Sequence, residues 1–338
     1  MKYKDPNLSV GERVEDLLAR MTLEEKVAQC VQIYIPPEDR EDILGRIRAT
    51  GLGSRILSAV PLAGSVTQRT AGIADLNAVQ RVAVEESRLG IPILSGMDVI
   101  HGQHTVFPIP LAMAAAFDPA ALEQASAIAA AETASMGIHW TFAPMMDIAR
   151  DPRWGRIIEG YGEDPYLGAK MAAAAVRGFQ GELDEKGYSR PGRVLACAKH
   201  YVGYGAAEGG RDYNTGEITD HTLRNIYLPP FKAAVQAGVG TVMAAFHDLN
   251  GEPASGSRYL LTDILKDEFG FTGFVISDWS SVGELVNHRV AADEREAARM
   301  AFDAGLDMEM ATECYTHHLA ELVQAGEISA QRLDDAVR

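Results

Sequence analysis

Short apolar runs alternate with longer segments of helical spacing along most of the chain. The short runs are rich in β-branched residues and predict strands, whereas the longer segments predict helices. The predicted strands are Val27–Ile33, Ile91–Gly96, His139–Ala143, Val194–Lys199, Gly240–Ala245, Phe274–Ser277 and Gly305–Met310. The predicted helices include Arg13–Met21, one capped by Thr22 with Glu25 as its capping-box partner, Ala120–Met136, Leu167–Gln180, Leu223–Ala237 and Arg295–Ala304.

Strands that alternate with helices predict an α/β protein with a parallel sheet. Seven or eight such units in 338 residues favour a closed barrel over an open sheet. The predicted fold is therefore a (β/α)8 barrel of the TIM type, formed by a single domain over residues 1–338.

Polar or charged residues follow most of the predicted strands. In a parallel barrel these strand ends open onto one face, where active sites are built. A solvated charge has no reason to recur at the end of each strand, so the set predicts a functional site. Its members are Asp98, Asp147, Lys199 with His200, His247 with Asp248, Asp278 with Trp279, and Glu309. Long Gly-, Arg- and Asp-rich segments follow two of these ends, at 147–165 and 201–217, and long loops in compact domains tend to be functional.

Composition and charge narrow the choice of ligand. The formal net charge is −16, which disfavours a nucleic acid or an anionic membrane surface and is compatible with a neutral sugar. The three cysteines are widely spaced, so neither a zinc site nor a disulfide framework is expected, and no cofactor motif is present. We find no signal-peptide core and no membrane-spanning stretch, so we expect a soluble chain. A cytoplasmic location is favoured, while a periplasmic or secreted protein and a homo-oligomer stay open.

The run Val275–Trp279 is the strongest local signal for chemistry. An apolar strand ends in the carboxylate of Asp278, which is followed by the large aromatic side chain of Trp279. Glycoside cleavage passes through a cationic oxocarbenium-like state and requires a carboxylate as nucleophile. An indole offers an apolar face to the C–H groups of a sugar ring. The alternative is that Asp278 caps the helix that follows it, since Asp is a good N-cap residue.

Three further segments carry candidate binding groups. The loop Asp151–Glu159 alternates acids and arginines, which predicts a self-paired scaffold from which Arg156 can reach a ligand. Lys199 and His200 are neighbours at a strand end and can donate hydrogen bonds to sugar hydroxyls. The carboxylate of Asp98 can accept hydrogen bonds from two adjacent hydroxyls. A metal site is disfavoured because no second ligand lies at metal-site spacing.

Taken together, these motifs resemble glycoside hydrolase family 3, of the bacterial β-glucosidase type. The matching stretches run in the family's order and cover nearly the whole chain. They are RVEDLLARMTLEEKVAQ, ESRLGIPILSGMDVIHGQHTVFPIPLA, GIHWTFAPMMDIARDPRWGRIIEGYGEDPYLG, KHYVGYGAAEGGRDYN, YLPPFKAAVQAGVGTVMAAF, GFTGFVISDW and AGLDMEM. The resemblance implies a (β/α)8 or partly collapsed barrel.

The resemblance also implies a role for individual residues. Asp278 would be the nucleophile of a retaining, exo-acting β-glucosidase that needs no cofactor. The residues expected to bind the sugar or line its subsite are Asp98, Arg156, Lys199, His200, Met243 and Trp279. Phe246 stands where many relatives carry a tyrosine, and this change removes a hydroxyl donor. His247 stands where many relatives carry an asparagine.

A retaining glycosidase also needs an acid/base group, and the resemblance does not assign one within this chain. In multi-domain relatives the acid/base group is a glutamate from a downstream α/β-sandwich domain. We expect that domain to lie outside residues 1–338. The single-domain N-acetylhexosaminidase branch uses a loop histidine, but Tyr204 occupies that position here. Glu208 and Glu309 are the candidates within the chain. Two alternative functions stay open. The first is a β-xylosidase or another exo-glycosidase, and the second is a barrel that binds sugar without turnover.

Overall fold

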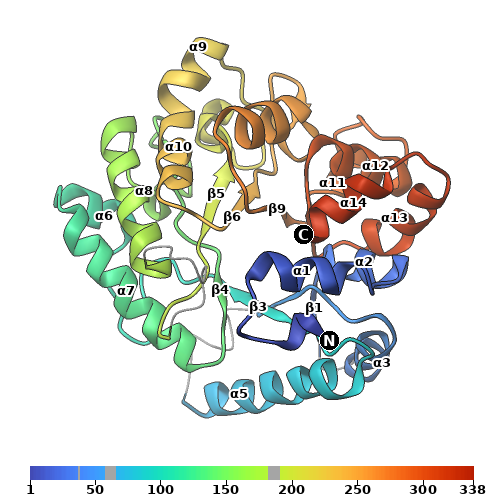
Figure 1. Cartoon of the computed structure of the whole chain (residues 1–338). Coiled ribbons are helices and arrows are strands. Elements are labelled where there is room, and N and C mark those ends of the chain that lie inside the picture. Colours follow the sequence, from blue (N-terminus) through green and yellow to red (C-terminus); the bar gives the residue numbers. More distant parts are fainter. Residues whose placement is uncertain (37–38, 58–65, 182–190) are drawn as a thin grey trace.

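Eight parallel strands form one sheet in the computed structural model, which describes residues 1–36, 39–57, 66–181 and 191–338 (Figure 1). The strand order is β4-β3-β2-β1-β10-β9-β6-β5. The strands are β1 (Val31–Tyr34), β2 (Ser54–Ile56), β3 (Leu94–Met97), β4 (Trp140–Thr141), β5 (Cys197–Tyr201), β6 (Thr241–Ala244), β9 (Phe274–Trp279) and β10 (Met308–Met310). Strands β4 and β5 stand at the two ends of this order, yet they follow each other along the chain. This is the arrangement expected when a sheet closes into a barrel.

Main-chain hydrogen bonds between the segments that contain β4 and β5 close the barrel. Thr141 N donates to Leu195 O at 2.8 Å, Lys199 N to Pro144 O at 3.1 Å, and Met146 N to Lys199 O at 2.8 Å. Strand β4 is only two residues long, and Pro144, which follows it, has no N–H group to donate to the ladder. The predicted (β/α)8 barrel is confirmed. Its two end strands, β4 and β5, are joined by isolated bridges rather than by a regular ladder, and we call this contact the β4–β5 junction.

Helices cover the outside of the barrel (Figure 1). Among the described residues none is long and apolar enough to cross a bilayer. The helices of the outer layer include α1 (Val10–Leu18), α2 (Leu23–Gln29), α3 (Arg40–Thr50), α5 (Val66–Arg81), α6 (Pro110–Ala115), α7 (Pro119–Ser135), α8 (Pro165–Gln180), α10 (Leu228–Gln236), the π-helix η8 (Tyr259–Glu268), α11 (Glu284–Asn287), α12 (Glu294–Ala304), α13 (Cys314–Gln324) and α14 (Ala330–Val337).

The predicted elements are largely present, although β3, β5 and β10 each begin three residues later than predicted, and two larger differences concern β1 and β2. The predicted strand Val27–Ile33 is wrong in its first half, because α2 continues to Gln29 and the strand begins only at Val31. The capping box at Thr22 and Glu25 that starts this helix is confirmed. Strand β2 was not predicted, because Ser54-Arg55-Ile56 is short and shows no apolar run. All three of its residues are nevertheless buried between β1 and β3.

The barrel interior is filled by side chains from alternate positions of the strands. Trp140 crosses it, and its indole Nε1 donates to Thr241 Oγ1 at 2.9 Å. The rings of Trp140 and Phe142 meet edge to face, with centroids 4.9 Å apart. The other buried members of this cluster are Ile56, Cys197, Met243, Ile276, Met308 and Met310. The interior is therefore a packed core, and ligands are restricted to its rim.

Candidate active site

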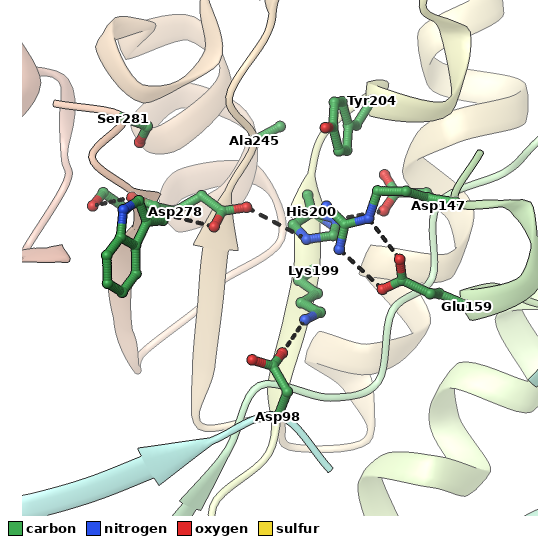
Figure 2. Close-up of polar contacts among 12 residues, drawn as sticks. Asp98, Asp147, Glu159, Lys199, His200, Tyr204, Ala245, Asp278 and Ser281 are labelled. Carbon is green, nitrogen blue, oxygen red and sulfur yellow. Dashed lines mark hydrogen bonds and ion pairs between the residues drawn. The ribbon is translucent and has the colours of Figure 1, made fainter. Parts of the chain in front are cut away.

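The carboxyl ends of β3, β5 and β9 bring Asp98, Lys199, His200 and Asp278 together (Figure 2). Lys199 is a buried strand residue whose ammonium donates to Asp98 Oδ1 at 2.5 Å. The Asp98 side chain is 42% exposed, so this pair links the interior of the site to solvent. The predicted convergence of these strand ends on one face is what the structure shows.

Asp278 is the buried carboxylate at the end of β9. Its Oδ1 accepts the main-chain N–H of Trp279 at 2.7 Å, and its Oδ2 lies 3.4 Å from His200 Nε2. Burial raises the pKa of Asp278 to about 7, against the opposing effect of the positive charge on Lys199. Helix α11 begins after Gly283, so Asp278 is not its N-cap residue. The alternative that Asp278 is only a helix cap is therefore wrong.

His200 is held from its other side by Asp147. Asp147 Oδ2 accepts both the main-chain N–H of His200, at 2.9 Å, and a contact of 2.8 Å from ring Nδ1. Burial, reinforced by the positive charges of Arg156 and Lys199, lowers the pKa of His200 well below its usual value. This shift favours the neutral form of the ring, which lies between the carboxyl groups of Asp147 and Asp278 (Figure 2).

Arg156 lies in the predicted self-paired loop. Its guanidinium donates to both carboxylate oxygens of Glu159, at 2.7 and 2.9 Å. Arg153 pairs in the same way with Asp151. Arg156 also lies over the ring of Tyr204, 5.6 Å from its centroid. The prediction that this loop pairs its own charges is confirmed.

The two long loops are packed against each other. Asp212 Oδ1 accepts from the indole of Trp154 at 2.9 Å and from the hydroxyl of Tyr204 at 2.5 Å. Gly205 allows this approach, because a Cβ at that position would lie 2.3 Å from the carbonyl oxygen of Ile148. The loop that carries Arg156 is thus fixed by the loop that follows His200.

The remaining expected subsite residues differ in accessibility. Trp279 is 47% exposed beside Asp278 and can meet a ligand directly. Phe246 is buried, and its ring packs 4.4 Å from that of Tyr213, which is exposed. Met243 is 2% exposed and belongs to the barrel-interior cluster, so its side chain supports the floor of the site. His247 is fully buried, with its ring 5.4 Å from that of Tyr204.

The two candidate acid/base residues within the chain lie in different settings. Glu309 is fully buried and accepts hydrogen bonds from Thr312 Oγ1, Tyr315 N and Thr316 N, at 2.7, 2.9 and 3.3 Å. It therefore satisfies the first main-chain N–H groups of α13. Glu208 is exposed in the loop after β5. The structure brings neither residue into contact with Asp278 among the described contacts.

Two partners in the site were not predicted from sequence. The sequence marks Asp147 only as a strand end, whereas in the structure its carboxyl group bonds both the main chain and the ring of His200. Glu159 was placed within the paired loop but was not assigned to Arg156. The spacing of three residues between Arg156 and Glu159 is a signal from which that ion pair could have been predicted. No local signal in the sequence links Asp147 to His200.

Comparisons with known proteins agree on one family. The model of the glycosyl hydrolase family 3 N-terminal domain matches residues 22–338. The periplasmic β-glucosidase of Salmonella typhimurium is 40% identical over 96% of this chain and 40% of its own length. A putative β-xylosidase of Formosa agariphila is 33% identical over 99% of this chain and 46% of its own length.

A solved structure supports the same relationship. The β-glucosidase of Listeria innocua in complex with glucose superposes with a TM-score of 0.88 at 39% identity, covering 96% of this chain and 45% of that one. The chain thus spans less than half the length of these relatives. From the matched domain, the sequence identity and the shared fold, the chain belongs to glycoside hydrolase family 3.

Proposed function

We propose that this chain is the catalytic barrel of a retaining, exo-acting β-glucosidase, with Asp278 as the nucleophile. The observation that carries the proposal is the placement of the Asp278 carboxylate. It lies buried at the carboxyl end of β9, between the ring of His200 and the exposed indole of Trp279. The names of the relatives from Salmonella and Listeria support a glucoside as the substrate.

In the first step, a carboxylate oxygen of Asp278 forms a bond to the anomeric carbon as the bond from that carbon to the leaving oxygen breaks. The leaving oxygen takes a proton from the acid/base group, and a glycosyl ester of Asp278 remains. In the second step, water attacks the same carbon, gives its proton to that group and frees Asp278. Ionised Asp278 is required at the start, and the cationic groups of Lys199 and Arg156 favour that form.

Five side chains are proposed to hold the sugar over Asp278. The carboxylate of Asp98 accepts hydrogen bonds from hydroxyls, while Lys199 and Arg156 donate to them. His200 contributes the one ring nitrogen that Asp147 leaves free. The indole of Trp279 offers its apolar face at the mouth of the site. Each cation is already paired with a carboxylate, so the site is ordered before the sugar arrives.

We further propose that the acid/base carboxyl group comes from a region of the full-length enzyme beyond the barrel. The setting of Glu309 at the start of α13 supports this, because its described hydrogen bonds come from two main-chain N–H groups of that helix and from Thr312 just before it. The model that matches this chain is that of the family's N-terminal domain, which is consistent with a further domain in the complete enzyme.

A β-xylosidase is the second candidate, because the relatives of this chain include a β-xylosidase of Formosa agariphila and a xylan 1,4-β-xylosidase of Xylanibacter ruminicola. Rates on matched aryl β-glucosides and β-xylosides separate the two. A barrel that binds sugar without turnover is distinguished from both by binding in the absence of any covalent adduct.

The test of the nucleophile is incubation with a 2-deoxy-2-fluoro aryl β-glucoside, followed by intact mass measurement and peptide mapping. Such a substrate needs little acid assistance, so the barrel itself can form the glycosyl ester. A single adduct on Asp278 is expected in the wild type and none in Asp278→Asn. Glu309→Gln is the matched control, because it replaces another buried carboxyl group whose pKa burial raises, to about 8, and it should be labelled like the wild type. An adduct elsewhere, or none on folded protein, would contradict the proposal.

A further inference from the structure

The imidazole of His200 is the one side chain that contacts two buried carboxylates in the described part of the site. Its Nδ1 lies 2.8 Å from Asp147 Oδ2, and its Nε2 lies 3.4 Å from Asp278 Oδ2. His200 itself is fully buried. Which nitrogen carries the proton therefore decides what Asp278 meets, because a neutral imidazole donates from one nitrogen and accepts at the other.

The contacts of Asp147 indicate that the proton is on Nδ1. Asp147 Oδ2 accepts the main-chain N–H of His200 at 2.9 Å, and a main-chain N–H can only donate. The same oxygen lies at hydrogen-bond distance from Nδ1 of the same residue. Burial raises the pKa of Asp147 to about 7, but an Oδ2 that carries no proton accepts both contacts, which leaves the ring with an unprotonated Nε2.

Burial of the ring is the main effect that lowers the pKa of His200, and charged groups around the ring add to it. Arg156 and Lys199 both disfavour a second proton on the imidazole, and so does nearby His247. The acids Asp98 and Glu159 face the same region but are paired with Lys199 and Arg156. A ring without an added proton then presents only a lone pair at Nε2, beside Asp278 Oδ2, which has no hydrogen-bond partner among the described residues.

We propose that Asp147 is a positioning residue: it fixes the Nδ1-protonated tautomer of His200, so that Nε2 faces Asp278 and the sugar as an acceptor. Asp278 then takes no N–H bond from the ring, and its described donor is the main-chain N–H of Trp279. An N–H donor at Nε2 would stabilise the carboxylate and weaken it as a nucleophile. A sugar hydroxyl can instead donate to Nε2. The effect on the nucleophile rests on the proposed function, whereas the tautomer does not.

Two variants of Asp147 separate its hydrogen bonding from its charge. Asp147→Asn keeps an oxygen that can accept from both N–H groups of His200, so the tautomer is retained. Asp147→Ala removes that acceptor, and an Nδ1–H would be buried without a partner. The ring should then move its proton to Nε2 and donate to Asp278.

Nitrogen NMR of 15N-histidine-labelled full chain reads the tautomer directly, and the His200 signal is identified by its loss in His200→Gln. We expect an Nδ1–H ring at pH 7 in the wild type and in Asp147→Asn, and an Nε2–H ring in Asp147→Ala. An Nε2–H ring or an imidazolium in the wild type would overturn the inference without any variant. An unchanged tautomer in folded Asp147→Ala would overturn it as well.

The rate of adduct formation with the 2-deoxy-2-fluoro aryl β-glucoside tests the consequence for Asp278. Asp147→Ala should slow labelling by about 10- to 100-fold, the range known for removal of the partner that orients a metal-bound histidine. Asp147→Asn should slow it less, and its rate should follow the tautomer seen by NMR. Equal slowing in both variants would contradict a tautomer effect. If the wild type forms no adduct, the proposed function fails, while the NMR result still decides the role of Asp147.

Discussion

Glu159 accepts two hydrogen bonds from Arg156, at 2.7 Å from Nε and 2.9 Å from Nη2. This fork-to-fork geometry fixes the plane of the guanidinium, and the ring of Tyr204 covers it at 5.6 Å. A flexible loop is thereby converted into a rigid support for one cation. The pair is about three-quarters buried, so it is less screened than an ion pair on the surface.

Arg156→Lys should weaken ligand binding at the site although the charge is retained. A lysine cannot form both bonds to Glu159 and has no planar fork. We expect the dissociation constant for a glucose-type inhibitor to rise by about tenfold or more, corresponding to roughly 1.4 kcal/mol. Calorimetric titration measures it. Arg153→Lys is the matched control in the same loop, because Arg153 is 70% exposed, and it should leave binding unchanged.

Trp279→Ala should impair ligand binding with little effect on folding. The indole is 47% exposed, so its removal leaves only a small cavity in the core. We expect weaker binding of aryl β-glucosides by about 5- to 20-fold, equivalent to roughly 1–2 kcal/mol of lost apolar contact. Fluorescence or calorimetric titration measures the loss. Tyr166→Ala removes another exposed aromatic ring, on α8, and should change neither binding nor stability.

Asp278→Asn should stabilise the protein at alkaline pH. Burial raises the pKa of Asp278 from 3.8 to about 7, so between these values the folded state retains a proton that the unfolded state loses. The contribution of Asp278 to stability is therefore present below pH 4 and is lost as pH rises through 7. A neutral amide avoids that loss, so the free energy of unfolding at pH 8 should rise by about 2–4 kcal/mol over the wild type.

Urea denaturation at pH 4 and pH 8 checks the sign, with a gain expected at pH 8 and a much smaller difference at pH 4. Asp151→Asn is the control of opposite sign, because its bonds to Arg153 lower the pKa of that carboxyl to about 2. A gain at pH 8 in both variants would indicate a general effect of reduced net charge rather than the burial of Asp278.

Glu309→Ala should destabilise the fold without acting on the site chemistry. It leaves the N–H groups of Tyr315 and Thr316 without their carboxylate acceptor at the start of α13. We expect a loss of about 2–4 kcal/mol in the free energy of unfolding, and a smaller loss in Glu309→Gln, which keeps one acceptor oxygen. Denaturation gives the energies. Glu309→Gln should still form the glycosyl adduct. If it forms none, Glu309 would again be a candidate for a catalytic role.

The barrel could be predicted from the sequence because its signal is local and repeated. The apolar runs before Asp98, Asp147, Lys199 and Asp278 each mark a strand, and a parallel barrel brings all such ends to one face. Strand β2 was missed because three residues carry too little pattern. The start of β1 was misplaced because Val27, which is buried on α2, reads equally well as part of a strand.

The pairing of Asp147 with His200 could not be predicted in this way. The two residues are 53 positions apart and meet only because β4 and β5 close the barrel. The hydrophobic pattern places each residue at a strand end. It does not say which side chain at one strand end contacts a side chain at the next strand end. The burial that raises the pKa of Asp278 likewise depends on the whole assembly.

The β4–β5 junction and the support of His200 form one continuous run of bonds. Met146 N donates to Lys199 O, and the next residues along each segment are the bonded pair Asp147 and His200. Parting the two segments there would release the imidazole while the other seven strand pairings were still intact. Local opening at this edge would thus free the His200 ring from Asp147 while circular dichroism still reported a folded barrel.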